Sequence, residues 1–183
     1  MEDDRGLVLA LRARKPDAFD QLYTRTSERV WRFLVRLAGA GAEDLFQETW
    51  LAAARHVHRL REDTLLLPWL FTIARNKYRN SLRAWARQSR GGQELRGRDA
   101  TQQISLDEEV NTRREVERTQ TAFARLPAAH REVLLLCVVE GLDTSAAART
   151  LGCSDQAVRK RLSRARRELA RRSGREEFAG GES

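Results

Sequence analysis

Residues 153–169 read CSDQAVRKRLSRARREL, and this stretch decides the fold of the C-terminal half of the chain. Its apolar residues recur at intervals of three and four: Val158, Leu162, Ala165 and Leu169. That spacing predicts an α-helix that buries one narrow stripe. From Asp155 to Arg175, nine Lys and Arg stand against two acidic residues, so the remaining helix surface carries dense positive charge.

The residues just before this helix complete a helix-turn-helix pattern. The Ala-rich segment TSAAARTL at 144–151 predicts a short helix that Gly152 can end. Ser154 or Asp155 can then cap the basic helix. Such a pair can place its second helix in the major groove of DNA. An ordinary helical hairpin with a charged, solvated face is the alternative.

The first turns of the basic helix carry side chains that can read base edges. An arginine can bridge guanine and a glutamine can bridge adenine, while arginines further along can neutralise phosphates. The predicted contacts with duplex DNA are Ser154, Asp155, Gln156, Arg159, Lys160 and Arg164.

A second basic segment, FTIARNKYRNSLRAWAR, covers residues 71–87. Residues 71–98 hold eight basic side chains against Glu94, whereas residues 1–64 hold eleven basic and eleven acidic ones. Basic side chains with interleaved aromatics suit a nucleic-acid strand whose bases have left the stack, although aromatics at this spacing also suit a core. The predicted contacts are Arg75, Asn76, Arg79, Asn80 and Arg83.

A third feature, AEDLFQETWLAAAR at residues 42–55, has the opposite charge. Asp44 and Glu48 lie on one helix face, with Gln47 and Leu51 adjacent. A compact acidic and apolar face on a basic protein suits docking to another protein. Carboxylates that merely favour the helix dipole in a solvated first turn are the alternative.

Helical periodicity and a polar, Gly-containing stretch define the organisation. The fold class predicted is all-α, with two small helical domains joined by a flexible linker. The predicted boundaries are 1–87 for the first domain, 88–112 for the linker, 113–173 for the second domain and 174–183 for a tail. Helices are expected at 18–40, 42–60 and 69–87 in the first domain, the last with Leu82 and Trp85 facing inward.

Composition excludes several classes of function. The chain has 183 residues, 41% of them apolar, a net charge of +8 and a pI near 10.6, which fits a polyanion-binding protein. His56, His58 and His130 lack metal-ligand spacing and are expected to be solvated. No phosphate loop or nucleophile motif appears, so no catalysis, cofactor or metal is expected. Cys137 is expected to be a buried, reduced thiol, and no apolar run reaches membrane-spanning length.

In order, these segments resemble the bacterial sigma factors of RNA polymerase, in the extracytoplasmic-function (ECF) group of the sigma-70 family. AFDQLY, AEDLFQETWLAAAR and WLFTIARNKYRNSLR are similar to parts of region 2. FARLPAAHREVLLLCVVEGL and TSAAARTLGCSDQAVRKRLSRARREL are similar to region 4. The resemblance covers nearly the whole chain and includes both domains in the family's order.

The resemblance implies partners for each segment. The acidic helix would dock on the clamp helices of the largest subunit of core RNA polymerase. The loop at 61–68 and the basic helix after it would melt promoter DNA and capture the minus-ten element, with one base flipped into a pocket. The second domain would read the minus-thirty-five element as duplex and meet the polymerase flap.

The chain would thereby direct promoter-specific initiation in the bacterial cytoplasm without performing chemistry, under control of an anti-sigma factor. The main rival is a helix-turn-helix regulator that binds an operator as a dimer and is not a polymerase subunit. A more distant rival is a nonspecific nucleic-acid-binding helical protein, for which mismatched sites would cost almost nothing.

Overall fold

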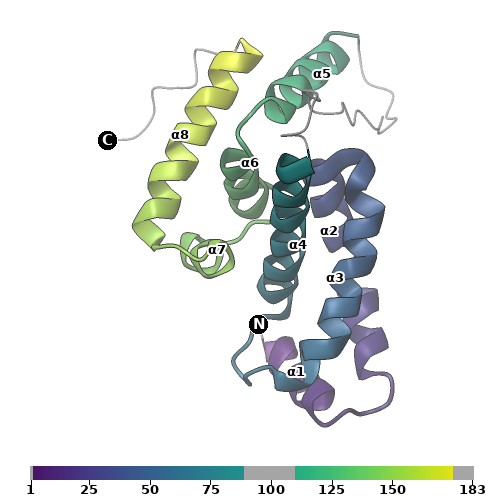
Figure 1. Cartoon of the computed structure of the whole chain (residues 1–183). Coiled ribbons are helices and arrows are strands. Elements are labelled where there is room, and N and C mark those ends of the chain that lie inside the picture. The colour runs from purple at the N-terminus through teal and green to yellow at the C-terminus, as the bar shows by residue number, and fades with distance from the viewer. Residues whose placement is uncertain (1, 89–109, 175–183) are drawn as a thin grey trace. The chain divides into compact units, whose positions relative to one another are not determined.

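The structure, a computed structural model, describes residues 2–88 and 110–174, and all regular elements within these ranges are helical (Figure 1). The all-α prediction is confirmed for this part of the chain. Contacts divide the chain into two compact units, Met1–Glu94 and Leu95–Ser183, called unit 1 and unit 2 below.

The predicted linker and tail fall largely outside the described residues. The helices nevertheless enter the predicted linker range from both sides, because Gln88 still belongs to one helix and Val110 begins the next. At the other end, Gly174 ends the last helix with a left-handed backbone, φ 75°.

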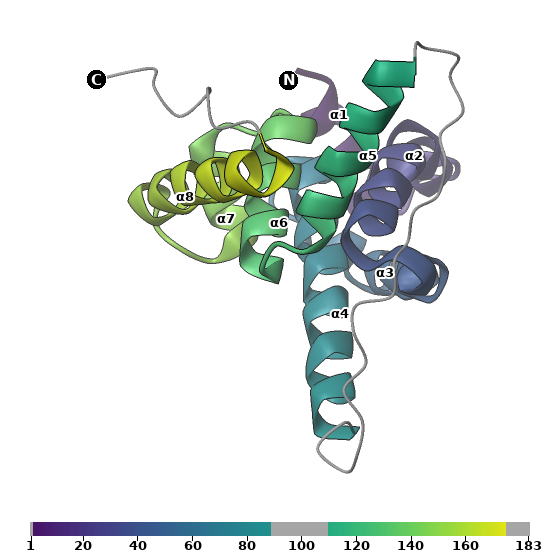
Figure 2. The same ribbon diagram turned by 90° about the horizontal axis from the view of Figure 1, so that it is seen from above.

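Unit 1 is built from helices that pack side by side. Its elements are α1 Glu2–Arg12, α2 Ala18–Ala38, η1 Gly39–Gly41, α3 Ala42–His56, η2 Val57–Arg59 and α4 Leu66–Gln88. Helices α2, α3 and α4 contact one another pairwise (Figure 2). Helix α1 packs on α2 and η2. The centre of the unit holds Phe33 and Phe71, both fully buried, with ring centroids 4.8 Å apart. Burying such a side chain stabilises the fold by about 1.5–3 kcal/mol.

Two features of unit 1 differ from the sequence-based expectation. Helix α1 was not predicted, since its apolar stripe consists only of Leu7, Val8 and Leu11, all of which are buried. The inward orientation expected for Leu82 and Trp85 was wrong, because these side chains are 37% and 43% exposed. Helices α2 and α3 cover the apolar stripe of α4 along only part of its length. The last turns of α4 extend beyond α3 in Figure 2.

Unit 2 places its longest helix against the other elements. Its elements are α5 Val110–Ala124, α6 Ala128–Leu134, the π-helical turn η4 Leu135–Val139, α7 Thr144–Leu151 and α8 Asp155–Ser173. Helix α8 contacts α5, α6 and α7. Val133, Leu136, Ala147 and Val158 are fully buried at their meeting point. Cys137 is only half-buried, contrary to expectation, and burial raises the pKa of its free thiol.

Candidate nucleic-acid interface

The helix-turn-helix of unit 2 is fixed by short-range polar contacts. At the start of α7, Asp143 Oδ1 accepts a hydrogen bond from Ala146 N at 2.6 Å. At its end, Gly152 adopts a left-handed conformation with φ 65°, which suits a residue without a Cβ. At the start of α8, Ser154 Oγ accepts from Ala157 N at 3.2 Å. The predicted C-cap at Gly152 is therefore confirmed, and of the two N-cap candidates, Ser154 and Asp155, it is Ser154 that caps α8.

Helix α8 buries a narrow stripe and exposes nearly all of its charge. Val158 and Ala165 are fully buried, and Leu162 and Leu169 are half-buried, as the spacing predicts. The exposed side chains include five of the six predicted DNA contacts: Ser154, Gln156, Arg159, Lys160 and Arg164. The sixth, Asp155, is half-buried and forms an ion pair with Arg159 one turn later.

The middle of unit 2 contains a polar cluster that joins α6 to α8. Glu168 Oε2 lies 3.0 Å from His130 Nδ1, and Glu168 Oε1 accepts from Arg172 Nη2 at 2.8 Å. The hydrogen bond from Arg172 is the main cause that lowers the pKa of Glu168, with smaller contributions from the Arg172 charge and from His130, against an opposing effect of burial. His130 is half-buried and paired in this way, so the expectation of a solvated side chain was wrong for this residue.

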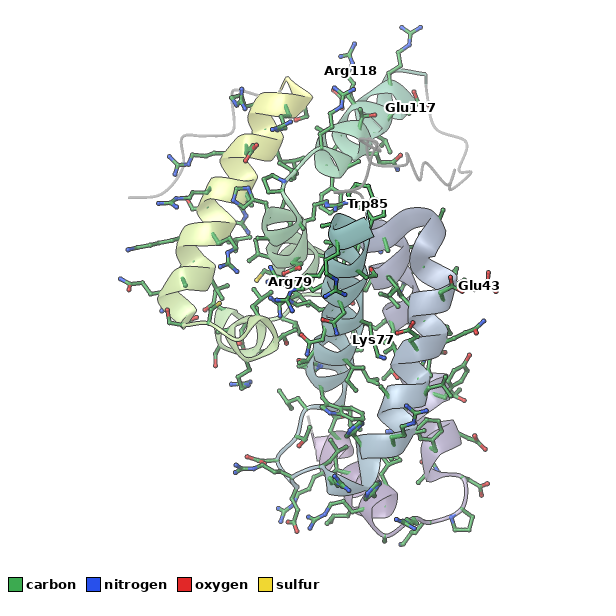
Figure 3. All side chains as sticks on the ribbon, in the orientation of Figure 1. Glu43, Lys77, Arg79, Trp85, Glu117 and Arg118 are labelled. Carbon is green, nitrogen blue, oxygen red and sulfur yellow. The ribbon has the colours of Figure 1, made fainter. Side chains whose placement is uncertain are left out.

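The basic ridge predicted in unit 1 lies on α4, but not all of its members are exposed. Asn76, Asn80 and Arg83 are exposed, and Arg79 is half-exposed. Arg75 is only 7% exposed, so this guanidinium belongs to the interior of the unit and not to the outer ridge. Figure 3 shows Lys77 and Arg79 projecting from α4.

The acidic face predicted on α3 is exposed in full. Asp44, Gln47, Glu48 and Leu51 all point away from the core, and Leu51 is 58% exposed. Their orientation follows from the opposite side of the helix, where Leu45, Thr49 and Ala53 are buried. An exposed leucine beside two carboxylates can supply apolar area to a protein partner.

The acidic face and the basic ridge meet at one ion pair that the sequence analysis missed. Lys77 Nζ on α4 lies 3.1 Å from Glu48 Oε2 on α3, with both side chains partly exposed. Only the packing of α3 on α4 brings together two residues that are 29 positions apart. No local sequence signal could have identified this pair.

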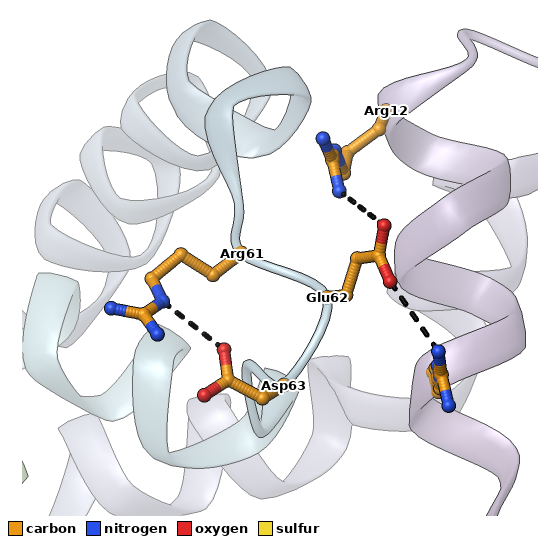
Figure 4. A network of polar contacts seen from close by, with 5 residues as sticks. Arg12, Arg61, Glu62 and Asp63 are labelled. Carbon is orange, nitrogen blue, oxygen red and sulfur yellow. Dashed lines mark hydrogen bonds and ion pairs between the residues drawn. The ribbon is translucent and has the colours of Figure 1, made fainter.

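The loop between η2 and α4, residues Leu60 to Leu65, has a defined turn. Thr64 N donates to Arg61 O at 3.1 Å, and Arg61 Nε donates to Asp63 Oδ1 at 3.2 Å (Figure 4). This loop leads directly into α4, whose later turns carry the basic ridge. It overlaps the 61–68 segment, for which the family resemblance implies a part in minus-ten capture.

Neither a metal centre nor a membrane span is found where the structure describes the chain. Within residues 2–88 and 110–174, no group of three or more His, Cys, Asp or Glu side chains is arranged to hold a metal ion. No helix in these ranges is both long and apolar enough to cross a membrane.

These features define a class: an all-helical DNA-binding protein with a helix-turn-helix unit and a second unit that combines an acidic face with a basic ridge. Residues 22–88 match the family model for Sigma-70 region 2, and residues 117–169 match the model for Sigma-70, region 4. With curated relatives at more than 30% identity over most of their length, the chain belongs to the sigma-70 family of RNA polymerase sigma factors, in its ECF group.

The curated relatives match along most of their length. The probable RNA polymerase sigma-C factor of Mycobacterium bovis is 32% identical over 168 residues, which cover 90% of this chain and 89% of the relative. RNA polymerase sigma factor CarQ of Myxococcus xanthus is 34% identical over 154 residues, covering 81% and 84%.

Solved structures of sigma factors share the fold. The sigma factor RpoE from Bartonella quintana, solved in complex with the anti-sigma factor NepR, matches with a TM-score of 0.71 and 26% identity over 85% of this chain and 96% of that one. CnrH, solved in complex with the cytosolic domain of CnrY, matches with a TM-score of 0.68 and 25% identity over 92% and 95%.

Proposed function

We propose that this sigma factor binds core RNA polymerase through the acidic face of α3 and promoter DNA through α4 and α8. One observation carries the proposal: adjoining helices of unit 1 expose opposite charges, while unit 2 exposes a separate basic helix in a helix-turn-helix. A protein that must hold a polymerase and two promoter elements needs three such surfaces.

The polymerase contact is assigned to Asp44, Gln47, Glu48 and Leu51. Exposed carboxylates favour a basic partner surface, and Leu51 adds apolar contact at one end of the patch. In the polymerase, the partner surface is that of the clamp helices of the largest subunit, with the flap as a second contact for unit 2.

The minus-ten contact is assigned to the exposed part of the α4 ridge, Asn76, Arg79, Asn80 and Arg83. Asn side chains can hydrogen-bond an unpaired base, and the arginines can hold the backbone of the separated strand. Unstacking a base costs a few kcal/mol, which contacts with the captured strand must offset. Because the side chain of Arg75 is buried, we assign this residue a supporting role and no direct contact with DNA.

The minus-thirty-five contact is assigned to α8. Gln156 and Arg159 lie in its first two turns, where a recognition helix meets base edges, and Lys160 and Arg164 follow on the exposed side. Ser154 and Asp155 act differently from a simple base contact. Ser154 caps the helix, and Asp155 orients the Arg159 guanidinium through their ion pair.

The protein supplies specificity and DNA melting to an enzyme and performs no chemistry itself. It acts in the bacterial cytoplasm, where its polymerase and promoters are. An anti-sigma factor is its proposed regulator, which the complexes of the similar sigma factors RpoE and CnrH support.

The test is run-off transcription with purified core polymerase and a library of promoter fragments from the native genome. Wild type is compared with Asp44→Ala/Glu48→Arg and with Arg159→Ala. We expect specific initiation from wild type and its loss in the double variant, whose binding to core polymerase fails. Arg159→Ala should still bind polymerase but lose initiation from promoters that depend on the minus-thirty-five element.

A different outcome would favour the rival function. If wild type initiates nowhere while the free protein shifts a palindromic operator, the protein is a dimeric regulator and its α3 face is expendable. Pull-down from the native host that recovers polymerase alone, under every stress applied, would remove the anti-sigma factor from the proposal.

A further inference from the structure

Helix α1 is connected to the loop that precedes α4 by two ion pairs on a single carboxylate. Glu62 Oε1 lies 3.2 Å from Arg12 Nη1, and Glu62 Oε2 lies 3.5 Å from Arg5 Nη2 (Figure 4). Arg5 and Arg12 lie seven residues apart on α1, so they share one face of that helix and approach Glu62 from two directions. The middle of the loop is thereby attached to a helix 50 or more residues earlier in the chain.

A third contact joins α1 to the start of α4 itself. Asp4 Oδ2 accepts a hydrogen bond from Leu66 N, the first residue of α4, at 3.0 Å. The first N–H groups of a helix have no partner within it and need acceptors from elsewhere. Leu65, immediately before α4, has no side-chain acceptor, so Asp4 performs the role of an N-cap from a distant part of the sequence.

Apolar packing holds both ends of the loop in the same place. Leu60 at its beginning is 7% exposed, and Leu66 just after it is 2% exposed. Helix α1 packs on η2, the turn that leads into the loop, and buries Val8 completely. Apolar burial therefore fixes the ends, and the three polar contacts of α1 fix the middle and the exit toward α4.

We infer that α1 positions the minus-ten recognition loop, with Asp4, Arg5 and Arg12 holding Glu62 and the first turn of α4 in the arrangement that accepts an unpaired base. This inference rests on the proposed role of α4 in holding the separated strand, and on the part in minus-ten capture that the family resemblance implies for the loop. Asp4, Arg5, Arg12 and Glu62 are positioning residues that act through the loop. Without these contacts, DNA binding must also order the loop. The apparent affinity then falls in proportion to the fraction of molecules whose loop already has the DNA-binding conformation.

Glu62→Gln gives a test in which positioning and plain electrostatics predict opposite signs. The substitution removes a negative charge, so electrostatics alone predicts equal or tighter binding of an anionic strand. Loss of positioning predicts weaker binding, by about two- to fivefold for two exposed ion pairs that share one carboxylate. The matched control is Glu28→Gln on α2, which removes the same charge from an exposed pair with Arg32.

The measurement uses the full chain assembled with core polymerase. Wild-type holoenzyme first selects single-stranded DNA from a random pool, and fluorescence anisotropy then gives the affinity of each variant for the selected strand and for versions with each base replaced. We expect Glu62→Gln to weaken binding and flatten the preference for the best base, while Glu28→Gln does neither. Reversing all three charges, in Arg5→Glu/Arg12→Glu/Glu62→Arg, should restore the preference that Glu62→Arg alone loses.

The outcomes separate this inference from the proposed function. If wild-type holoenzyme selects no strand and shows no base preference, the proposed minus-ten role fails. If wild type is selective and Glu62→Gln matches Glu28→Gln, only the positioning role of α1 is overturned. Tryptophan fluorescence melting shows that each variant is folded, because all four tryptophans of the chain lie in unit 1.

Discussion

Unit 2 fixes its DNA-facing helix with residues beside it in the sequence, whereas unit 1 fixes its basic helix with residues far away. In unit 2, Gly152 and Ser154 form the turn and the cap that orient α8. In unit 1, α4 receives its first capping contact from Asp4, and its basic face pairs with Glu48 of another helix. Both helices pack on the rest of their unit, but the start of α8 is set by a local motif, and the start of α4 is capped by a residue from a distant part of the sequence.

The largest expected effect comes from placing a charge in the core of one unit at a time. Val158→Asp, at a fully buried position of α8, should destabilise unit 2 by more than about 4 kcal/mol, enough to unfold it. Circular dichroism should then show a loss of helix at low temperature. Tryptophan fluorescence, which reports on unit 1 alone, should keep its wild-type melting curve.

The matched variant in unit 1 is Leu70→Asp, at a fully buried position of α4. It should abolish the tryptophan melting transition and leave the helical signal of unit 2. Equal loss of both signals in either variant would mean that the two units fold as one cooperative body, and the contrast between them would disappear.

The next largest effect concerns how α8 reads duplex DNA. Arg159→Ala should cost about 1–3 kcal/mol of binding and relax specificity at one base pair, because an arginine there is expected to bridge a base edge. Arg164→Ala should weaken binding to all DNA sequences alike and reduce the salt dependence of the affinity by about one released counterion. The measurement is holoenzyme affinity for minus-thirty-five duplexes with single base-pair changes at several salt concentrations. A uniform loss in both variants would reassign Arg159 to the phosphate backbone.

A smaller effect, of opposite sign in the two units, follows from replacing glycines by alanine. Gly152 has φ 65° with open space around its Cα, so Gly152→Ala should destabilise unit 2 by about 1–2 kcal/mol through the backbone alone. Gly6 lies within α1, where an added methyl group would also meet open space, so Gly6→Ala should stabilise α1 by about 1 kcal/mol. Melting followed by circular dichroism and by tryptophan fluorescence measures the two changes separately. Effects of the same sign would contradict this account.

The same contrast explains how far the sequence could predict the molecule. The helix-turn-helix could be predicted from the sequence because its signals all lie within residues 144–169. These signals are the helical spacing of the apolar residues, the glycine of the turn and the capping serine. The exposed face of α3 was readable too, since Asp44, Glu48 and Leu51 follow one helical spacing. In both cases the information lies within a short stretch of consecutive residues.

The missed features depend on contacts between distant segments. Asp4 capping Leu66 and Lys77 pairing with Glu48 involve residues that become neighbours only when helices pack. Arg75 has the same spacing as the more exposed Arg79 and Arg83, and only the depth of α4 in the unit decides that it is buried. Helix α1 carried a weak signal, three apolar residues at helical spacing, in a segment rich in charge.

The smallest expected effect concerns acid and tests the polar cluster in which Glu168 of α8 pairs with His130 of α6. The pKa of Glu168 is lowered in the folded protein, chiefly by its hydrogen bond from Arg172, so the unfolded chain binds the proton more readily. The stabilisation is therefore present above the ordinary glutamate pKa and is lost as the pH falls through the lowered folded value. Glu168→Gln should remove this contribution and flatten the acid dependence of unit 2 melting below the ordinary glutamate pKa.

The control for this prediction is an arginine-paired glutamate in the other unit. Glu28→Gln removes a carboxylate that also pairs with an arginine four residues later, but on an exposed surface and without a histidine. It should leave the tryptophan melting temperature near its wild-type value, since an exposed pair of this kind contributes little. If Glu168→Gln and wild type lose helical signal in parallel on acidification, then the Glu168 cluster does not help to hold α8. Its local caps and the packing of its apolar stripe then suffice, and the contrast with α4, whose start is capped by the distant Asp4, becomes sharper still.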